Sequence, residues 1–383
     1  MGLRARWRAG GVAVAKTSRN LRPPARLTFL SVDLAHAKRL RCPVCSATPL
    51  DAHAFGTIEG RCREGVLVCR ECSSWNPIVD FVAEVLPPGH EAGAARARLY
   101  EGHREALEGL GLDPPAEAGE PDERYAAQAH QREYFDSIAH RDDEYSYRAF
   151  GELSFQRAHR NVSFDEWRRR ISRDSVLLDI GCADGLSTFE FAELDADVLA
   201  FDISPEQVAQ AARRAREMGF RRASFFVGDA HEIPVSDASV DVVVCWGVLH
   251  HLPDPGHTVA EAARVLKEGG AYFGMENNRT PLRSAFDALM RLSPLWEEEA
   301  GAQPLIDAED LDRWAAGTGL EFETRTSVFV PPHVLTRMSA PAATRALARS
   351  DRMAGGIPGV RDWGGTILIE GHKRSRDRAG AYR

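Results

Sequence analysis

Short apolar runs alternate with helical stretches through the middle of the chain. The runs that predict strands are residues 175–180, 197–201, 223–227, 240–245 and 271–275. Helices are predicted between them at residues 186–194, 205–218 and 257–266. Short strands that alternate with helices of about 10–15 residues favour crossover connections and a mostly parallel sheet. Residues 280–319 look helical, and later strands at 321–330 and 366–370 would add an antiparallel edge to an α/β fold.

The segments around this alternation predict a second, smaller unit. The expected organisation is a disordered basic extension (1–37), a small cysteine-containing β module (38–88), a helix and linker (89–122), the main domain (123–372) and a disordered tail (373–383). A helix over residues 91–110 precedes a linker rich in Pro and Gly, and another helix begins at Glu123. The Arg-rich, acid-poor N-terminus also has the pattern of an organelle transit peptide, which stays open as an alternative.

Composition narrows the class of protein. The chain has 383 residues, of which 44% are hydrophobic and 27% charged, as in globular proteins. Its net charge of -8 argues against broad nucleic-acid binding, which usually needs a basic face. No apolar run is long enough to predict a transmembrane helix. The cysteines are too sparse for a disulfide scaffold, so we expect a reducing, cytoplasmic environment and a metal site. The oligomeric state is not predicted.

The strongest chemical signal is the glycine turn after the first strand of the main domain. Gly181 would let backbone approach a ligand closely, and Gly185 would ease entry to the following helix. Asp202 ends the next strand, about 20 residues on, where a carboxylate can accept hydrogen bonds from ribose hydroxyls. Asp229 follows the third strand and could accept from an adenine amino group. The simpler alternatives are helix capping and turn chemistry, although Ser204 suits the cap better than Asp202.

The ordered motifs LLDIGCADG, FDIS, GDAHEIPVSDASVDVVVCWGVLHHLPDP and LKEGGAYF resemble class I S-adenosylmethionine-dependent methyltransferases, closest to the ubiquinone and menaquinone subgroup. The resemblance covers roughly residues 123–372 and implies a Rossmann-like fold with S-adenosylmethionine as cofactor. It places a set of residues at the cofactor: Asp179, Gly181, Cys182, Ala183, Gly185, Asp202, Ile203, Asp229, Ala230, Cys245, Trp246 and Gly247. Ala183 stands where the family usually has a glycine, which is tolerable if its φ is negative.

Methyl transfer requires mainly that the acceptor and the methyl group are aligned, so a catalytic residue need not be obvious. His250 and His251 follow the fourth strand, and His250 is the better candidate for a general base. Both histidines could instead cap or pack. Glu276, Asn277 and Asn278 follow the fifth strand and could orient an acceptor or bond within loops. Tyr134 and Phe135 lie on the preceding helix, which in the resembled family often covers the cofactor, or they could pack in the core.

Two C-x2-C pairs predict a zinc site in the small module. Cys42, Cys45, Cys69 and Cys72 can deliver four thiolates to one tetrahedral Zn²⁺, and the spacer between the pairs fits two strands and a loop. Four thiolates leave no open position, so the zinc would be structural. Cys62 is spare. The segments LRCPVCSATPL and VLVCRECSSWNPIVDFVAEVLP resemble the zinc-binding activator subunit of translation-related and tRNA methyltransferases, which implies a module that stabilises the catalytic domain or shapes its entrance.

The sequence therefore predicts a methyltransferase for a small-molecule or lipid-like acceptor, at O, N or C. RNA methylation is the enzymatic alternative, which the acidic charge balance disfavours. A catalytically silent partner that keeps the fold for docking is the alternative from another class. Fold does not fix function, so the acceptor is predicted by analogy.

Overall fold

A computed structural model describes residues 34–58, 60–87, 89–90, 93–115, 123–141, 147–295 and 304–375. Most of the predicted basic extension, part of the linker and the end of the predicted tail lie outside these ranges. Residues 34–37 were expected in the extension, but they form a short helix, α1 (Leu34–Ala37), in which the His36 and Ala37 side chains are buried. The small module therefore begins earlier than the sequence suggested.

The predicted strands of the main domain form one sheet. They are β5 (Val176–Ile180), β6 (Asp197–Asp202), β7 (Ala223–Val227), β8 (Val240–Trp246), β9 (Leu266–Asn277), β10 (Leu320–Ser327) and β11 (Thr366–Lys373). Their spatial order is β7-β6-β5-β8-β9-β11-β10, and β11 runs antiparallel to both neighbours. A mostly parallel sheet with an antiparallel edge is confirmed. The strand order reverses between β5 and β8, where open α/β sheets bind ligands.

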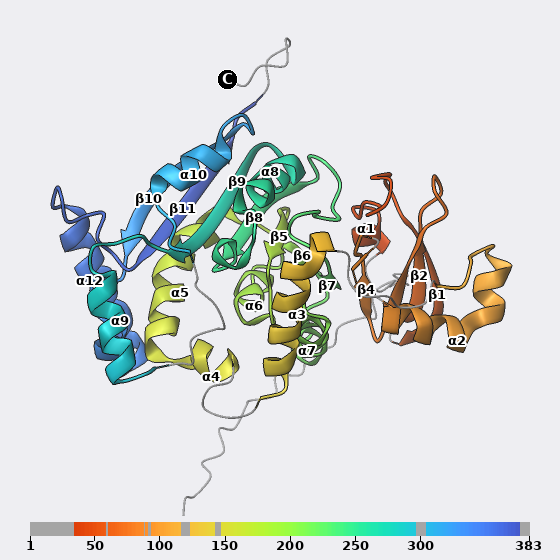
Figure 1. Cartoon of the computed structure of the whole chain (residues 1–383), viewed down its shortest axis with the longest axis horizontal. Coiled ribbons are helices and arrows are strands. Elements are labelled where there is room, and N and C mark those ends of the chain that lie inside the picture. The colour runs from red at the N-terminus through yellow and green to blue at the C-terminus, as the bar shows by residue number, and fades with distance from the viewer. Residues whose placement is uncertain are drawn as a thin grey trace, which may run out of the picture.

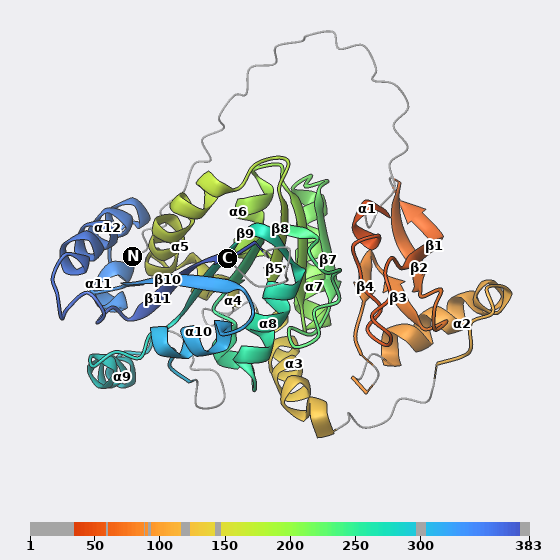
Figure 2. The same ribbon diagram turned by 90° about the horizontal axis from the view of Figure 1, so that it is seen from above.

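Helices cover both faces of this sheet (Figures 1 and 2). One face packs α5 (Ser154–Trp167), α6 (Leu186–Ala192) and α7 (Pro205–Glu217) around buried aromatic side chains such as Phe164 and Phe191. The other face packs α8 (Pro255–Val265) and α10 (Ala308–Ala315). The cap prediction holds, because the Ser204 hydroxyl accepts from the Gln207 backbone N–H at the start of α7.

The remaining helices of the main domain gather around the carboxyl ends of the parallel strands. They are η1 (Glu123–Tyr125), α3 (Ala126–Ala139), α4 (Tyr147–Glu152), α9 (Arg283–Leu292), α11 (Pro332–Thr336) and α12 (Ala340–Gly355), with the short 3-10 turn η3 (Leu249–His251). A second 3-10 turn, η2 (Arg168–Arg170), follows α5 and precedes β5. Helix α3 lies beside α7, and α11 and α12 pack on α5. No helix of the described ranges is both long and apolar enough to span a membrane.

The small module continues the sheet of the main domain. Strands β1 (Asp51–Ile58), β2 (Arg61–Val68), β3 (Trp75–Val79) and β4 (Val82–Glu84) pair antiparallel in sequence order. Strand β4 then pairs parallel with β7, through Ala83 opposite Phe226 and Glu84 opposite Val227. One core cluster runs across this joint. Helix α2 (Gly93–Gly109), predicted at 91–110, follows the module and has a kink at His103.

Candidate active site

A cavity of about 880 Å³ opens at the carboxyl ends of the parallel strands. Eight of the predicted cofactor residues line it: Gly181, Ala183, Asp202, Ile203, Asp229, Ala230, Trp246 and Gly247. The structure thus brings together residues from the ends of β5, β6, β7 and β8. We call this part of the cavity the cofactor half.

The turn after β5 is built from positive-φ residues. Gly181 has a φ of 71°, and a Cβ at this position would collide with the Val248 side chain. Gly185 has a φ of 84° at the start of α6, where a Cβ would meet the Phe189 ring at 2.6 Å. Ala183 does not meet the condition of a negative φ, because its φ is 44°. The left-handed conformation costs an alanine about 1–2 kcal/mol. The contacts of the surrounding turn must therefore stabilise this conformation.

Asp202 ties this turn to the end of β6. Its Oδ2 accepts from the Ala183 backbone N–H at 2.9 Å, and its Oδ1 accepts from the Ser204 N–H at 3.0 Å. Burial raises the pKa of the Asp202 carboxyl, and these hydrogen bonds offset only part of the effect. A carboxylate accepts up to about four hydrogen bonds, so the side chain retains capacity for hydroxyl donors in the cavity.

Four of the predicted cofactor residues do not line the cavity: Asp179, Cys182, Gly185 and Cys245. The Asp179 carboxylate accepts from the Thr188 hydroxyl at 2.6 Å, which links β5 to α6. Burial raises the pKa of Asp179 to about 7, despite the Thr188 hydrogen bond. Cys182 and Cys245 are buried in the two core clusters on opposite faces of the sheet. The Asp179, Cys182 and Cys245 side chains therefore pack beneath the cavity and do not face it.

Asp229 has partners from two directions. Its Oδ1 accepts from the His231 backbone N–H at 2.8 Å, and its Oδ2 lies 3.0 Å from Nε2 of His90, which follows the small module. Burial opposes ionisation of Asp229, but the hydrogen bonds from His231 and His90 outweigh it and hold the pKa of this carboxyl below its usual value. The sequence did not point to His90.

His250 forms a dyad with a buried carboxylate. Its Nδ1 lies 2.6 Å from Oε2 of Glu276, whose Oε1 accepts from the backbone N–H groups of Val248 and Leu249. An ionised Glu276 accepts at both oxygens, and this arrangement favours the His250 tautomer that donates from Nδ1 to Oε2 and has its basic lone pair on Nε2. Glu276 therefore holds His250 and its loop, which matches the loop bonding that the sequence offered as the alternative to orienting an acceptor.

His251 lies beside this dyad, in an apolar environment. The centroids of the His251 and His250 rings are 4.0 Å apart, and the His251 ring contacts Phe135 edge-on. Burial, with a smaller contribution from His250, lowers the pKa of His251 to about 2, so the ring resists protonation. Asn278 donates to the backbone carbonyls of Asp362 and Gly364, which is the loop bonding considered as its alternative. Asn277 lines the cavity.

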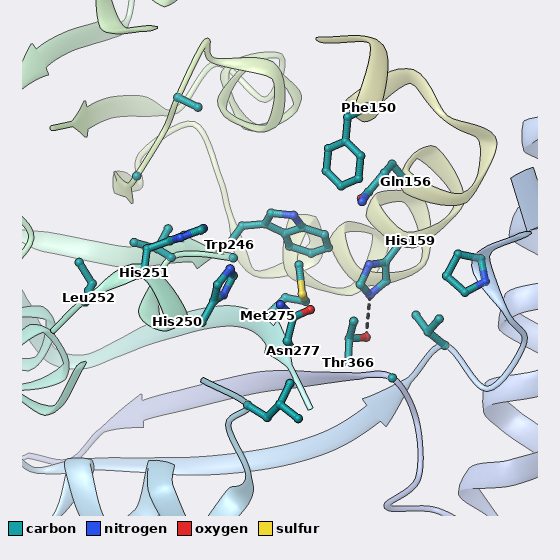
Figure 3. Close-up of a pocket in the computed structure, with 18 of the residues that line it drawn as sticks. Phe150, Gln156, His159, Trp246, His250, His251, Leu252, Met275, Asn277 and Thr366 are labelled. Carbon is teal, nitrogen blue, oxygen red and sulfur yellow. Dashed lines mark hydrogen bonds between the residues drawn. The ribbon is translucent and has the colours of Figure 1, made fainter. Parts of the chain in front are cut away.

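The other half of the cavity is mainly apolar, and we call it the acceptor half. Its apolar lining residues are Phe150, Phe155, Met275, Leu282, Phe286, Leu289, Phe329, Pro331, Pro332 and Trp363. Figure 3 shows His159 and Gln156 on the side opposite the two loop histidines, with Trp246 and Met275 between. His159 Nε2 lies 3.1 Å from the Thr366 hydroxyl, and burial, helped by Arg160, lowers the pKa of His159 to about 3. The sequence did not single out His159 or Gln156.

Helix α3 closes the cavity on one side. Tyr134 and Phe135 line the cavity, as expected for a covering helix. Asp136 accepts from the Ser204 hydroxyl at 2.5 Å and so anchors α3 to the start of α7. Gln128 also lines the cavity and is 8% exposed, and among the described residues its Oε1 has no hydrogen-bond partner. A buried amide oxygen without a partner is costly, so this atom is suited to accept from a bound ligand.

The four predicted metal ligands meet in one cluster. The Sγ atoms of Cys42, Cys45, Cys69 and Cys72 all lie within 4.8 Å of one another, with Cys42–Cys72 at 3.7 Å and Cys45–Cys69 at 3.5 Å. Tetrahedral Zn²⁺ with Zn–S bonds of about 2.3 Å requires sulfur atoms about 3.8 Å apart. The thiolate set therefore fits structural zinc. The Cys62 thiol lies apart and donates to the Glu64 carbonyl.

Comparison with known proteins shows to which family the main domain is related. Residues 178–274 match the methyltransferase domain family. The chain carries a class I methyltransferase domain. It is 31% identical over 162 residues to the ubiquinone biosynthesis O-methyltransferase of Xanthomonas axonopodis pv. citri, covering 41% of this chain and 66% of that protein. Thus the matched segment spans a little under two thirds of that relative's length.

Other similarities cover different shares of the domain. The 27-O-demethylrifamycin SV methyltransferase of Amycolatopsis mediterranei is 44% identical over 96 residues, which is 24% of this chain and 35% of that protein. A solved complex of the Haloferax volcanii Trm112 methyltransferase activator with a methyltransferase aligns over 64% of this chain and 99% of that one, at 21% identity and a TM-score of 0.45.

Proposed function

We propose that the chain is an S-adenosylmethionine-dependent methyltransferase that acts on a hydroxyl group of a small, largely apolar acceptor. The observation that carries this proposal is the dyad of His250 and Glu276, in which His250 lines the cavity and Glu276 is buried behind it. The match of residues 178–274 to a methyltransferase family supports S-adenosylmethionine as the cofactor. The apolar lining supports the class of acceptor.

The residues of the cofactor half fit S-adenosylmethionine. Gly181 permits close approach of a ligand to the backbone, and Asp202 has acceptor capacity for ribose hydroxyls. Asp229, Ala230 and Gln128 would surround the adenine, and Trp246 with Gly247 would border the methionine. When bound, the cofactor supplies a methyl group on a sulfonium, which a nucleophile displaces in line.

A hydroxyl acceptor needs to lose its proton as it attacks, and His250 is placed to take it. Glu276 is fully buried and receives Nδ1–H, so it fixes the ring orientation and stabilises the imidazolium that would form. His251 is the weaker candidate because burial disfavours its charged form. The dyad therefore favours O-methylation over the wider choice of O, N or C that the sequence left open.

The acceptor half favours a ligand with a large apolar or aromatic body. Phenylalanine, proline and tryptophan side chains dominate its lining, and the Arg283 and Asp287 side chains neutralise each other at 2.6 Å. His159 is held neutral by burial, so it offers a hydrogen bond without a charge. The two relatives described above are named for O-methylation, in ubiquinone biosynthesis and on a demethylrifamycin, and they support the same reaction here.

The first experiment is binding of labelled S-adenosylmethionine to the zinc-loaded protein. We expect the wild type to bind and Asp202→Ala to lose about 10- to 100-fold in affinity, since charged hydrogen bonds contribute about 1.5–3 kcal/mol. Asp165→Ala is the matched control, because that exposed carboxylate pairs only with Arg169 among its described contacts. Methyl transfer to phenolic and aliphatic hydroxyl acceptors is then measured, with RNA as a comparison. A folded wild type that binds no cofactor would leave the silent docking partner as the better hypothesis.

A further inference from the structure

The pairing of β4 with β7 brings the His90 side chain next to Asp229 in the cofactor half. Strand β4 runs parallel to β7, and the Val85 N–H continues the ladder by donating to the Val227 carbonyl at 2.9 Å. Since parallel strands end at the same edge of a sheet, the chain that leaves β4 arrives where Asp229 follows β7. His90 is on this connection, before α2.

His90 is buried against that carboxylate. The His90 and Asp229 side chains are each 2% exposed, and Nε2 lies 3.0 Å from Oδ2. The His90 ring also packs against the Tyr125 ring, with centroids 3.8 Å apart and the planes tilted by 37°, and the Tyr125 hydroxyl donates to Glu232. Three segments of the chain thus fix one imidazole: the connection after the module, the start of the covering helix, and the loop after β7.

The second histidine on Asp229 fixes the other oxygen. His231 Nδ1 lies 3.3 Å from Oδ1, and its Nε2 accepts from the Asp254 N–H at 3.3 Å. Because Nε2 is an acceptor, the ring hydrogen of neutral His231 is on Nδ1 and faces Oδ1. The described donors to Asp229 are then His90 Nε2, His231 Nδ1 and the His231 backbone. A carboxylate takes up to about four hydrogen bonds, which leaves room for one more donor from the cavity that Asp229 lines.

We propose that His90 is a positioning residue for adenine recognition: it sets the orientation of the Asp229 carboxylate, so that the connection between the small module and α2 contributes to the cofactor site. This inference rests on the proposed function. Its distinguishing consequence is that His90 contributes to affinity only through the group that Asp229 reads, the exocyclic amino group of adenine.

The test is calorimetric binding of S-adenosylhomocysteine to the full, zinc-loaded chain. His90→Ala is expected to weaken binding about 10-fold, the loss of one hydrogen bond to a charged group. His90→Gln, whose amide nitrogen can take the place of Nε2, is expected to restore most of it. His103→Ala is the matched control, because His103 on α2 makes the same kind of contact with Glu64 of β2, at 3.0 Å.

A second ligand separates positioning from general damage to the fold. In the analogue with purine in place of adenine, hydrogen replaces the exocyclic amino group. The wild type should bind this analogue more weakly than S-adenosylhomocysteine. The affinity of His90→Ala for the analogue should be close to that of the wild type. An equal loss on both ligands, or no loss on either, would overturn the proposal while leaving the methyltransferase function standing. No binding of S-adenosylhomocysteine by the folded wild type would instead count against the proposed function and remove the basis of this inference with it.

Discussion

The two halves of the cavity are built in different ways. Apart from Gln128 on α3, the cofactor half comes from one stretch of chain, between Gly181 and Val248, and it uses strand ends, positive-φ turns and carboxylates that bond to backbone. The acceptor half collects side chains from α4, α5, α9 and the loops before α11 and β11, most of them apolar. The family match, residues 178–274, covers the first half and stops just before Met275.

This difference explains why similarity to known methyltransferases indicates the cofactor but not the acceptor. A fixed cofactor demands fixed backbone geometry, so the same short motifs serve many enzymes. An acceptor is held by side chains on helices and loops, which vary without disturbing the sheet. The dyad of His250 and Glu276 stands at the border, with its histidine inside the matched segment and its glutamate just after it.

The largest effect is expected from Glu276→Gln at this border. The glutamine Oε1 would keep the two backbone donors, and its amide would donate to His250 Nδ1, which moves the ring hydrogen to Nε2 and removes the basic lone pair from the cavity. We expect kcat to fall about 10²- to 10⁴-fold with cofactor affinity unchanged. Steady-state kinetics and cofactor titration check this, with His251→Asn as the comparison variant. Equal kcat for the wild type and Glu276→Gln would rule out the dyad as the base.

The next effect separates the two halves. Phe286→Ala removes a half-buried ring from the acceptor half and should raise KM for the acceptor about 10-fold or more, since burying a phenylalanine side chain contributes about 1.5–3 kcal/mol. Cofactor affinity should not change. Leu292→Ala is the control, because that side chain lies on the same helix but is 85% exposed. If Phe286→Ala weakens cofactor and acceptor equally, the division into halves is wrong.

A pH effect is expected behind the cofactor half. The pKa of Asp179 is raised to about 7 in the folded chain, whereas an unfolded aspartate titrates near 4. Between these values the folded state binds more protons than the unfolded state, so this group's contribution to stability is present at low pH and is lost as pH rises towards 7. Asp179→Asn should therefore flatten the fall of Tm between about pH 4 and pH 7, measured without cofactor. Parallel Tm profiles would show that Asp179 is ionised throughout.

The smallest effect concerns Ala183. With a φ of 44°, Ala183→Gly should relieve left-handed strain of about 1–2 kcal/mol, offset by about 0.5–1 kcal/mol for the greater freedom of glycine when unfolded. We expect a gain of about 0.5–1 kcal/mol in the free energy of unfolding, measured by urea titration. A loss of stability would mean that the turn relaxes around the methyl group.

The sequence predicted the parts of the molecule in which local chemistry determines structure. Alternating apolar runs gave the strands, the cysteine spacing gave the thiolate cluster, and the turn after β5 gave the cofactor half. It could not reveal His90, His159 or the role of Glu276, because each depends on a partner that only the tertiary fold brings near: Asp229, Thr366 and the Val248 backbone. The φ of Ala183 was likewise set by the turn and not by the residue type.

The parallel pairing of β4 with β7 has a consequence for how the chain can be divided. In the described structure, the outer edge of β7 is covered by β4 and, through it, by the rest of the module. A fragment cut at the linker before Glu123 would present that edge with unpaired N–H and C=O groups beside apolar side chains such as Phe226, which invites strand addition from another molecule. The boundary that looks natural in the sequence is thus a poor place to truncate, and the module protects the catalytic sheet from self-association.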